Sequence, residues 1–163
     1  MNRLLRLCLP LLFGFGAALA PGAGAAAQFR HTAWSIERGA PADIWALAQD
    51  ADGYLWLGTG NGLYRFDGVH FGRVAPGDTA FATSNITALH VAPDGALWIG
   101  FFYGGAAVLK DGAITRYGSA DGFPDGMVLA FARTRDGVLW AASRGGLLRF
   151  DGARWHAAGA QHG

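Results

Sequence analysis

Short apolar runs alternate with polar, glycine-rich turns from residue 44 almost to the end of the chain. In the first such stretch an apolar run at 44–48 leads into a polar turn, and further runs follow at 54–58, 63–66 and 69–74, the last being more polar. Runs of this length, rich in aliphatic and aromatic side chains and separated by Asp-Gly dipeptides, are typical of antiparallel strands joined by tight hairpins. We therefore expect four consecutive β-strands in this stretch.

The same stretch occurs three times with a constant period. Strands are expected to open at Ile44, Ile86 and Val128, which lie 42 residues apart. An Asp-Gly turn and a tryptophan keep the same step, at Asp52, Asp94 and Asp136, at Gly53, Gly95 and Gly137, and at Trp56, Trp98 and Trp140. An internal period of about 40–50 residues indicates a repeat architecture, and each unit here contains only predicted strands.

Four antiparallel strands in about 42 residues are the size of one propeller blade. The sequence thus predicts an all-β fold of three four-stranded blades, at 44–85, 86–127 and 128–163. We expect the repeated tryptophans to fill the space between neighbouring blades. Propellers close with about four to eight blades, so we expect an incomplete ring, an open fan. Either further blades of a longer protein or self-association of this chain would complete the ring.

The first 43 residues differ from the repeats. Residues 1–27 combine two arginines, an apolar run and small residues ending at Ala27, which predicts a secretory signal peptide cleaved near that residue. The alternative is an uncleaved membrane anchor. Residues 28–43 are expected to hold an outer strand, at 29–36, and a linker. The sequence WSIERGAP at 34–41 resembles YGSADGFP at 117–124, which joins the second and third blades.

Charge and composition exclude several functional classes. Thirteen basic and 12 acidic residues give a net charge of +1, which offers no electrostatic case for a nucleic-acid partner. The single cysteine, Cys8, lies in the leader, so the exported chain would carry no disulfide or cysteine nucleophile. Five histidines are scattered without metal-ligand spacing, and Glu37 is the only glutamate. We expect no metal, no cofactor and no enzymatic activity.

A candidate binding surface follows from blade topology. The Asp-Gly turns after the first and third strands lie at one end of each sheet, and the loops after the second and fourth strands lie at the other end. Trp98 and Asp111 are 13 positions apart, against 11 in the other two copies, and the two extra residues fall within 101–105. Loops on a rigid scaffold often carry recognition, and aromatic side chains beside polar ones suit a sugar-like ligand. The alternative for the insert is a bulge that covers the next blade. The candidate ligand-binding residues are Trp45, Asn61, Phe101, Phe102, Tyr103 and Arg144.

Several motifs of the chain resemble a known family. The first copy reads DGYLWLGT at 52–59 and NGLYRFDG at 61–68, and the linkers contain SNI at 84–86 and DGFP at 121–124. These residues resemble the two-component regulator propeller repeat, over about 29–155. The resemblance implies the periplasmic sensor region of a membrane receptor. In such receptors an immunoglobulin-like domain, a transmembrane helix and a histidine kinase or diguanylate cyclase follow the propeller. This sequence contains no second membrane span and no kinase or cyclase motif, so it resembles an N-terminal fragment.

The sequence therefore predicts a periplasmic, non-enzymatic, ligand-sensing propeller segment of a two-component-type receptor. We expect it to bind an unidentified small molecule or glycan on the loop face, with inter-blade packing passing the change to downstream signalling domains. Its other expected partners are the missing blades of a longer chain or copies of itself. Two alternatives remain open: a scaffold or protein-interaction propeller of the cell envelope, and a propeller lyase or hydrolase.

Overall fold

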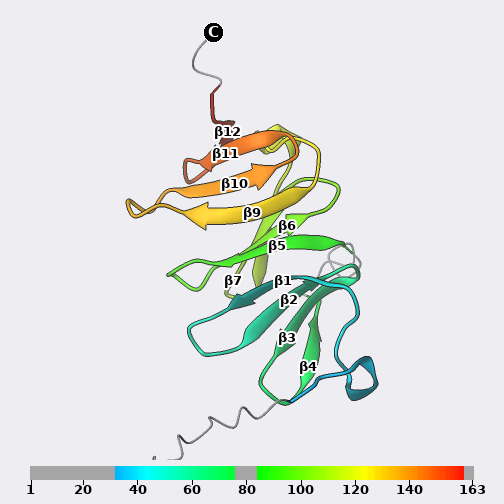
Figure 1. Ribbon diagram of the computed structural model, residues 1–163. Coiled ribbons are helices and arrows are strands. Elements are labelled where there is room, and N and C mark those ends of the chain that lie inside the picture. Colours follow the sequence, from blue (N-terminus) through cyan, green and yellow to red (C-terminus); the bar gives the residue numbers. More distant parts are fainter. Residues whose placement is uncertain (1–31, 76–83, 160–163) are drawn as a thin grey trace, which may run out of the picture. The chain divides into compact units, whose positions relative to one another are not determined.

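A computed structural model describes residues 32–75 and 84–159 of this 163-residue chain. Over these residues the chain forms twelve strands in three antiparallel four-stranded sheets (Figure 1). In each sheet the strands lie side by side in sequence order, β1 to β4, β5 to β8 and β9 to β12. The predicted all-β fold with propeller-like blades is confirmed. The predicted signal peptide at 1–27 lies outside the described residues.

The strands follow the apolar runs of the sequence closely. The first sheet consists of β1 (Ile44–Gln49), β2 (Leu55–Thr59), β3 (Gly62–Phe66) and β4 (Phe71–Val74). The second consists of β5 (Ile86–Val91), β6 (Leu97–Phe101), β7 (Ala106–Lys110) and β8 (Ala113–Tyr117). The third consists of β9 (Val128–Arg133), β10 (Leu139–Ser143), β11 (Gly146–Phe150) and β12 (Trp155–Ala157).

The aspartates of the hairpin turns bind the backbone that follows them. In the β3–β4 turn the Asp67 carboxylate accepts the N–H groups of Val69 and His70, at 2.7 and 2.6 Å. In the β11–β12 turn Asp151 accepts those of Ala153 and Arg154, both at 2.8 Å. Such local bonds favour turns over continued strand, which explains why Asp-Gly recurs at these positions.

The first and second sheets pack through a largely aliphatic core. Its buried residues are Leu63 of β3 together with Ile86, Leu97, Ile99, Phe101, Ala107 and Leu109 of the second sheet. Gly58 of β2 permits the close approach, because a Cβ atom there would lie 2.5 Å from Cγ2 of Ile86. We call this set the aliphatic interface.

The second and third sheets pack through a core rich in aromatic rings, which we call the aromatic interface. Its buried rings are Trp98, Phe123 and Trp155, and the rings of Tyr117, Phe131 and Phe150 pack against them. The two sheets also share a hydrogen bond, since the Thr87 hydroxyl donates to the Val128 carbonyl oxygen at 2.6 Å. Successive side chains along the strands of the second sheet thus point alternately toward the first and the third sheet, because side chains of a strand alternate between its two faces.

The repeated tryptophans differ in their burial. Trp98 is 7% exposed and belongs to the aromatic interface. Trp56 is half-buried and packs against the aliphatic interface. Trp140 is also half-buried, belongs to neither described interface, and its indole nitrogen is buried without a hydrogen-bond partner. The expectation of inter-blade packing is untested for Trp140, because its side of β10 faces away from the second sheet and no described sheet lies on that side.

The segment before the first sheet resembles the linker between the second and third sheets. A 3-10 helix, η1 (Ile36–Arg38), matches η2 (Ser119–Asp121), and each ends on a glycine with positive φ, 88° at Gly39 and 83° at Gly122. Residues 32–35 form no strand, and the rest of the strand expected at 29–36 lies outside the described residues. Among the described residues no helix is long and apolar enough to cross a membrane.

Candidate ligand-binding site

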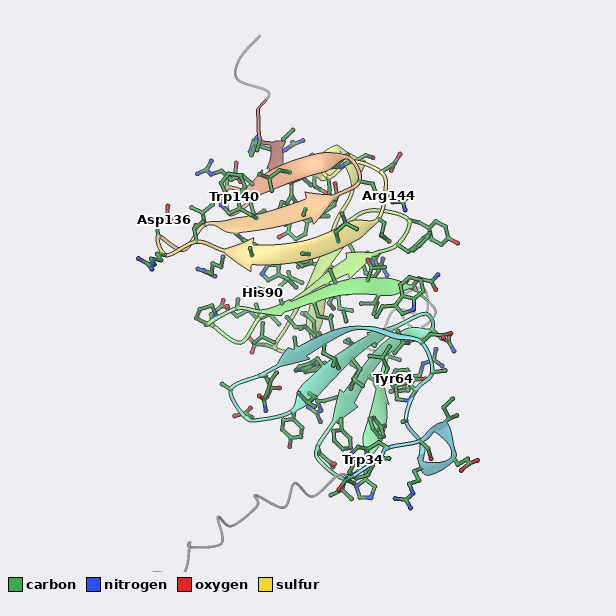
Figure 2. The ribbon with its side chains drawn as sticks, in the orientation of Figure 1. Trp34, Tyr64, His90, Asp136, Trp140 and Arg144 are labelled. Atoms are coloured by element: carbon green, nitrogen blue, oxygen red, sulfur yellow. The ribbon has the colours of Figure 1, made fainter. Side chains whose placement is uncertain are left out.

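The two ends of each sheet differ in chemistry. Asp136, in the β9–β10 turn, and Arg144, in the β10–β11 loop, lie at opposite ends of the third sheet (Figure 2). We call the end that carries the Asp-Gly turns the turn end, and the end that carries the second loops and the inter-sheet linkers the linker end. All six candidate residues belong to segments at the linker end.

Equivalent backbone hydrogen bonds organise the linker end in all three sheets. Each second loop donates one N–H to the carbonyl oxygen of the linker just before the first strand of its own sheet. The three bonds are Gly60 to Asp43 at 3.2 Å, Phe102 to Asn85 at 3.0 Å, and Arg144 to Met127 at 2.9 Å. Donors and acceptors both keep the 42-residue step of the sequence, so the repeat sets this geometry.

The insert at 101–105 places a row of aromatic rings at the linker end. The Phe102 ring contacts Trp45 of β1, with centroids 5.7 Å apart, and Tyr103, with centroids 5.0 Å apart. Tyr103 is 79% exposed, whereas Phe101 is 8% exposed and belongs to the aliphatic interface. Three of the six predicted residues are thus brought together, and a fourth, Phe101, adjoins them along the chain.

The insert also borders a pocket of about 330 Å³. Its side-chain lining includes Phe101, Tyr103, Arg116, Tyr117, Ser119 and Asp125. The Arg116 guanidinium lies over the Phe101 ring, 5.5 Å from its centroid. Gly104 of the insert forms an isolated β-bridge with Asp125, so one wall of the pocket is tied to the linker that leads into the third sheet. The insert therefore both shapes a hollow and covers part of this linker.

The two remaining candidates lie on the corresponding loops of the outer sheets. Asn61 accepts two hydrogen bonds from Arg73 of β4, at 2.9 Å to its backbone oxygen and 3.1 Å to its side-chain oxygen. Arg144 is exposed and lies against Gly126, where a Cβ atom would come within 3.2 Å of the Arg144 Cβ. Asn61 is thus already engaged, while Arg144 lies beside the linker into the third sheet.

The sequence pattern missed the polar half of this pocket. Arg116 comes from β8, while Ser119 and Asp125 come from the linker that follows it. The pattern did place this linker at the linker end, so their general location could have been inferred. Nothing in the repeat period shows which side chains of a linker face the insert.

A second hollow lies at the turn end, where the sequence predicted only uniform turns. A cleft of about 590 Å³ opens between the second and third sheets. Its charged side chains are Asp94, Lys110, Arg133, Asp136, Arg149 and Asp151, and the rings of Trp98, Tyr117 and Phe150 lie below them. Tyr117 borders both this cleft and the pocket at the linker end.

The turn aspartates are held ionised by their hydrogen bonds. Backbone N–H groups of Arg154 and Ala153 keep the pKa of Asp151 far below its usual range, with a further contribution from His156. The Lys110 ammonium lowers the pKa of Asp94, and a hydrogen bond from Thr134 lowers that of Asp136. A general acid needs the opposite shift, so these carboxylates are not poised as general acids. Over 32–75 and 84–159, no group of three metal-ligating side chains occurs.

The first copy of the repeat matches a known family model. Residues 39–61, which include β1 and β2, match the two component regulator propeller. The chain contains a two-component regulator propeller repeat. The sequence has no significant match among curated proteins.

Solved structures share the fold of this propeller segment. One is the extracellular domain of BT3049 from B. thetaiotaomicron, assigned to the hybrid two-component systems, at a TM-score of 0.63 and 20% identity. That match covers 74% of this chain and 18% of the BT3049 chain. Virginiamycin B lyase from Staphylococcus aureus aligns at a TM-score of 0.57 and 14% identity, over 70% of this chain and 40% of the lyase. The chain thus spans less than a fifth of the BT3049 chain, and an extracellular domain of a two-component system and an enzyme share its fold.

Proposed function

We propose that this chain is a ligand-sensing propeller segment of a two-component-type receptor in the periplasm. We further propose that it binds a small molecule or oligosaccharide at the linker end, without catalysing a reaction. The observation that carries the proposal is the insert at 101–105, which breaks the repeat spacing at the place where it lines a pocket. The family match at 39–61 supports the sensor role.

The lining of the pocket suits a polar ligand with a ring. Tyr103 presents an exposed ring, on which one face of a sugar can stack. Arg116 and Ser119 supply donors and Asp125 an acceptor, so hydroxyl groups would find partners of both kinds. Trp45 extends the row of rings toward the first sheet through Phe102, which gives a longer oligosaccharide a second place to stack.

The insert is also connected to the sheets in a way that suits signalling. Phe102 is bonded to Asn85, which precedes β5, and Gly104 is bridged to Asp125, which precedes β9. A ligand that moves the insert would therefore pull on the entry segments of two sheets at once. In this proposal the change passes through the inter-sheet packing to further blades and signalling domains of a longer chain.

The test is ligand-dependent thermal unfolding with a set of defined neutral oligosaccharides, comparing Tyr103→Ala with Tyr54→Ala. Tyr54 is the matched control because it precedes β2 at the turn end, where Arg65 lies 4.5 Å from its ring centroid. We expect at least one oligosaccharide to raise the Tm. Tyr103→Ala should weaken that binding by about threefold to tenfold, the range for one lost stacking contact, and Tyr54→Ala should leave it unchanged. Equal effects of the two variants, or no shift with any ligand, would contradict the proposal.

The scaffold alternative has an observation of its own. Leu129 of β9 and Leu147 of β11 are 51% and 50% exposed, which gives the third sheet apolar side chains that another protein surface could cover. Sedimentation of the exported chain separates the two functions. A ligand-sensing segment changes its Tm with an oligosaccharide, whereas a self-associating scaffold changes its mass with protein concentration.

A further inference from the structure

The cleft at the turn end has an apolar floor. Trp98 and Tyr117 stack there with centroids 5.5 Å apart and an interplanar angle of 26°, and Phe150 meets Trp98 edge-on at 5.0 Å. The small side chains of Ala92 and Ala96 line the adjoining wall. A floor of flat rings with short aliphatic neighbours favours a flat apolar ligand over a heavily hydroxylated one.

The carboxylates at the rim are already occupied. Asp94 accepts a 2.6 Å bond from the Lys110 ammonium, and Asp151 accepts two backbone N–H groups and contacts His156 at 2.6 Å. The pKa of Asp136 is lowered by nearby Thr134 and by the charge of Arg149. These acids would offer few acceptors to the hydroxyl groups of a sugar, so the cleft differs in kind from the pocket at the linker end.

Two cations of the rim, Arg133 and Arg149, form no ion pair within the described ranges, and Arg149 acts on the pKa of Asp136. The other, Arg133, has no carboxylate of the rim as a partner. Within the described ranges its guanidinium forms no ion pair and donates no hydrogen bond. It lies against the β9–β10 turn, where a Cβ atom at Gly137 would be 3.4 Å from its Nη2. Its charge lowers the pKa of His90 in the facing sheet, after the larger effect of burial. A guanidinium in this state has its donor fork available for a planar anion.

From this arrangement we propose that the turn-end cleft is a second binding site, which takes a flat aromatic monocarboxylate. The ring packs against the accessible edges of the floor rings, Trp98, Tyr117 and Phe150, and the carboxylate receives two N–H groups of Arg133. The volume of about 590 Å³ accommodates a ligand of one or two fused rings. This site is independent of the linker-end pocket, apart from the shared Tyr117.

The experiment is calorimetric titration of the chain with benzoate and indole-3-acetate, each beside its neutral amide, benzamide or indole-3-acetamide. We expect at least one acid to bind and its amide to bind about tenfold more weakly or worse, because the amide cannot form a charge-assisted pair. Arg133→Gln should cause a similar loss for the acid. Arg135→Gln is the matched control, since Arg135 lies two residues after Arg133, in the β9–β10 turn, and is exposed but does not line the cleft.

The remaining outcomes each decide against the site. Failure of both acids to bind at millimolar concentration overturns the proposal. Equal binding of an acid and its amide also overturns it, and this comparison uses only the wild-type chain. Wild-type affinity in a folded Arg133→Gln protein removes the role of Arg133. Tyr103→Ala should leave acid binding unchanged, so a loss in that variant would move the binding to the linker-end pocket.

Discussion

The two interfaces of this chain are built at the same repeat positions but with different side chains. At the aliphatic interface Trp56 remains half-buried: its indole N–H donates to Asp50 at 2.8 Å, and Arg65 lies 5.8 Å from its ring centroid. At the aromatic interface Trp98 is 7% exposed, and Phe150 and Trp155 lie 5.0 and 5.7 Å from it. Trp56 is hydrogen-bonded within its own sheet, whereas rings of the neighbouring sheet pack directly on Trp98.

One cross-strand partner accounts for much of this difference. Arg65 lies opposite Trp56, whereas Val108 lies opposite Trp98. An arginine must keep its charged end in water, so it holds the edge of an interface open, while valine allows rings of the next sheet to close over the tryptophan. The repeat thus determines the backbone, and single substitutions within it determine how each pair of sheets packs and where a cleft with an aromatic floor forms.

The largest expected effect is the loss of stability when the tryptophan of each interface is replaced by alanine. Trp98→Ala should lower the free energy of unfolding by about 3–5 kcal/mol, because it empties the centre of a ring cluster. Trp56→Ala should lower it by about 1–2 kcal/mol, from lost edge packing and the lost bond to Asp50. Urea denaturation of both variants measures the difference. Equal losses would show that the two interfaces are energetically equivalent despite their composition.

The next effect concerns the glycines that set the spacing of the sheets. A Cβ atom at Gly100 would lie 2.6 Å from both Cβ and Cγ1 of Val128. Gly100→Ala should therefore destabilise the chain by about 1–3 kcal/mol through overpacking. Gly58→Ala should behave similarly at the aliphatic interface, where the contact is with Ile86. Destabilisation by both variants would show that each interface depends on a glycine that lets the neighbouring strand approach closely.

Two controls sharpen the glycine prediction. Gly72→Ala in β4 is the matched control, since its added Cβ would meet its nearest atom only at 3.8 Å and should cost little. The double variant Gly100→Ala with Val128→Ala should lose less stability than the sum of the single variants, because the second change removes the atoms that clash. Strict additivity in urea denaturation would rule out a direct clash between these positions.

The fold could be predicted because its signals are local. The 42-residue period, the Asp-Gly turns and the apolar runs fixed three sets of four strands, since hairpin formation depends on neighbouring residues. The behaviour of Trp140 could not be predicted in the same way. The burial of Trp140 depends on what packs against its side of the third sheet, and its own repeat does not supply that neighbour. Its half-buried ring shows that a position in the repeat does not by itself determine how exposed the side chain is.

The candidate sites could be predicted only in part, because most of their side chains meet through packing between distant segments. The insert stood out in the sequence because it changed the spacing from 11 to 13 residues, and it led to Phe101 and Tyr103. Arg116 and Asp125 carry no such mark, because they meet the insert only through the packing of β8 and its linker. Arg133 lies in a regular strand, and nothing in the repeat period marks it as a residue that lines the turn-end cleft.

The smallest expected effect is a dependence on pH that arises at the aromatic interface. His90 of β5 has a buried Nε2 atom without a hydrogen-bond partner, and burial, followed by the charge of Arg133, lowers its pKa. At the equivalent positions the first and third copies carry Ala48 and Ala132, so this group is particular to the second sheet. Because the folded state resists protonation of His90 and the unfolded state does not, stability is fully present above the unfolded pKa of about 6.5 and declines as the pH falls below it.

The measurement for His90 is the free energy of unfolding between about pH 7.5 and pH 5 for the wild type and His90→Gln. The wild type should lose more stability across this window, and the variant should show a flatter curve. Arg133→Gln should flatten it in part, because it removes the smaller of the two causes. The turn aspartates, whose pKa values are lowered, lose their contribution only at more acidic pH, so they do not produce this slope. Parallel curves for wild type and His90→Gln would mean that His90 takes up protons equally well in both states, and that the aromatic interface admits water at this position.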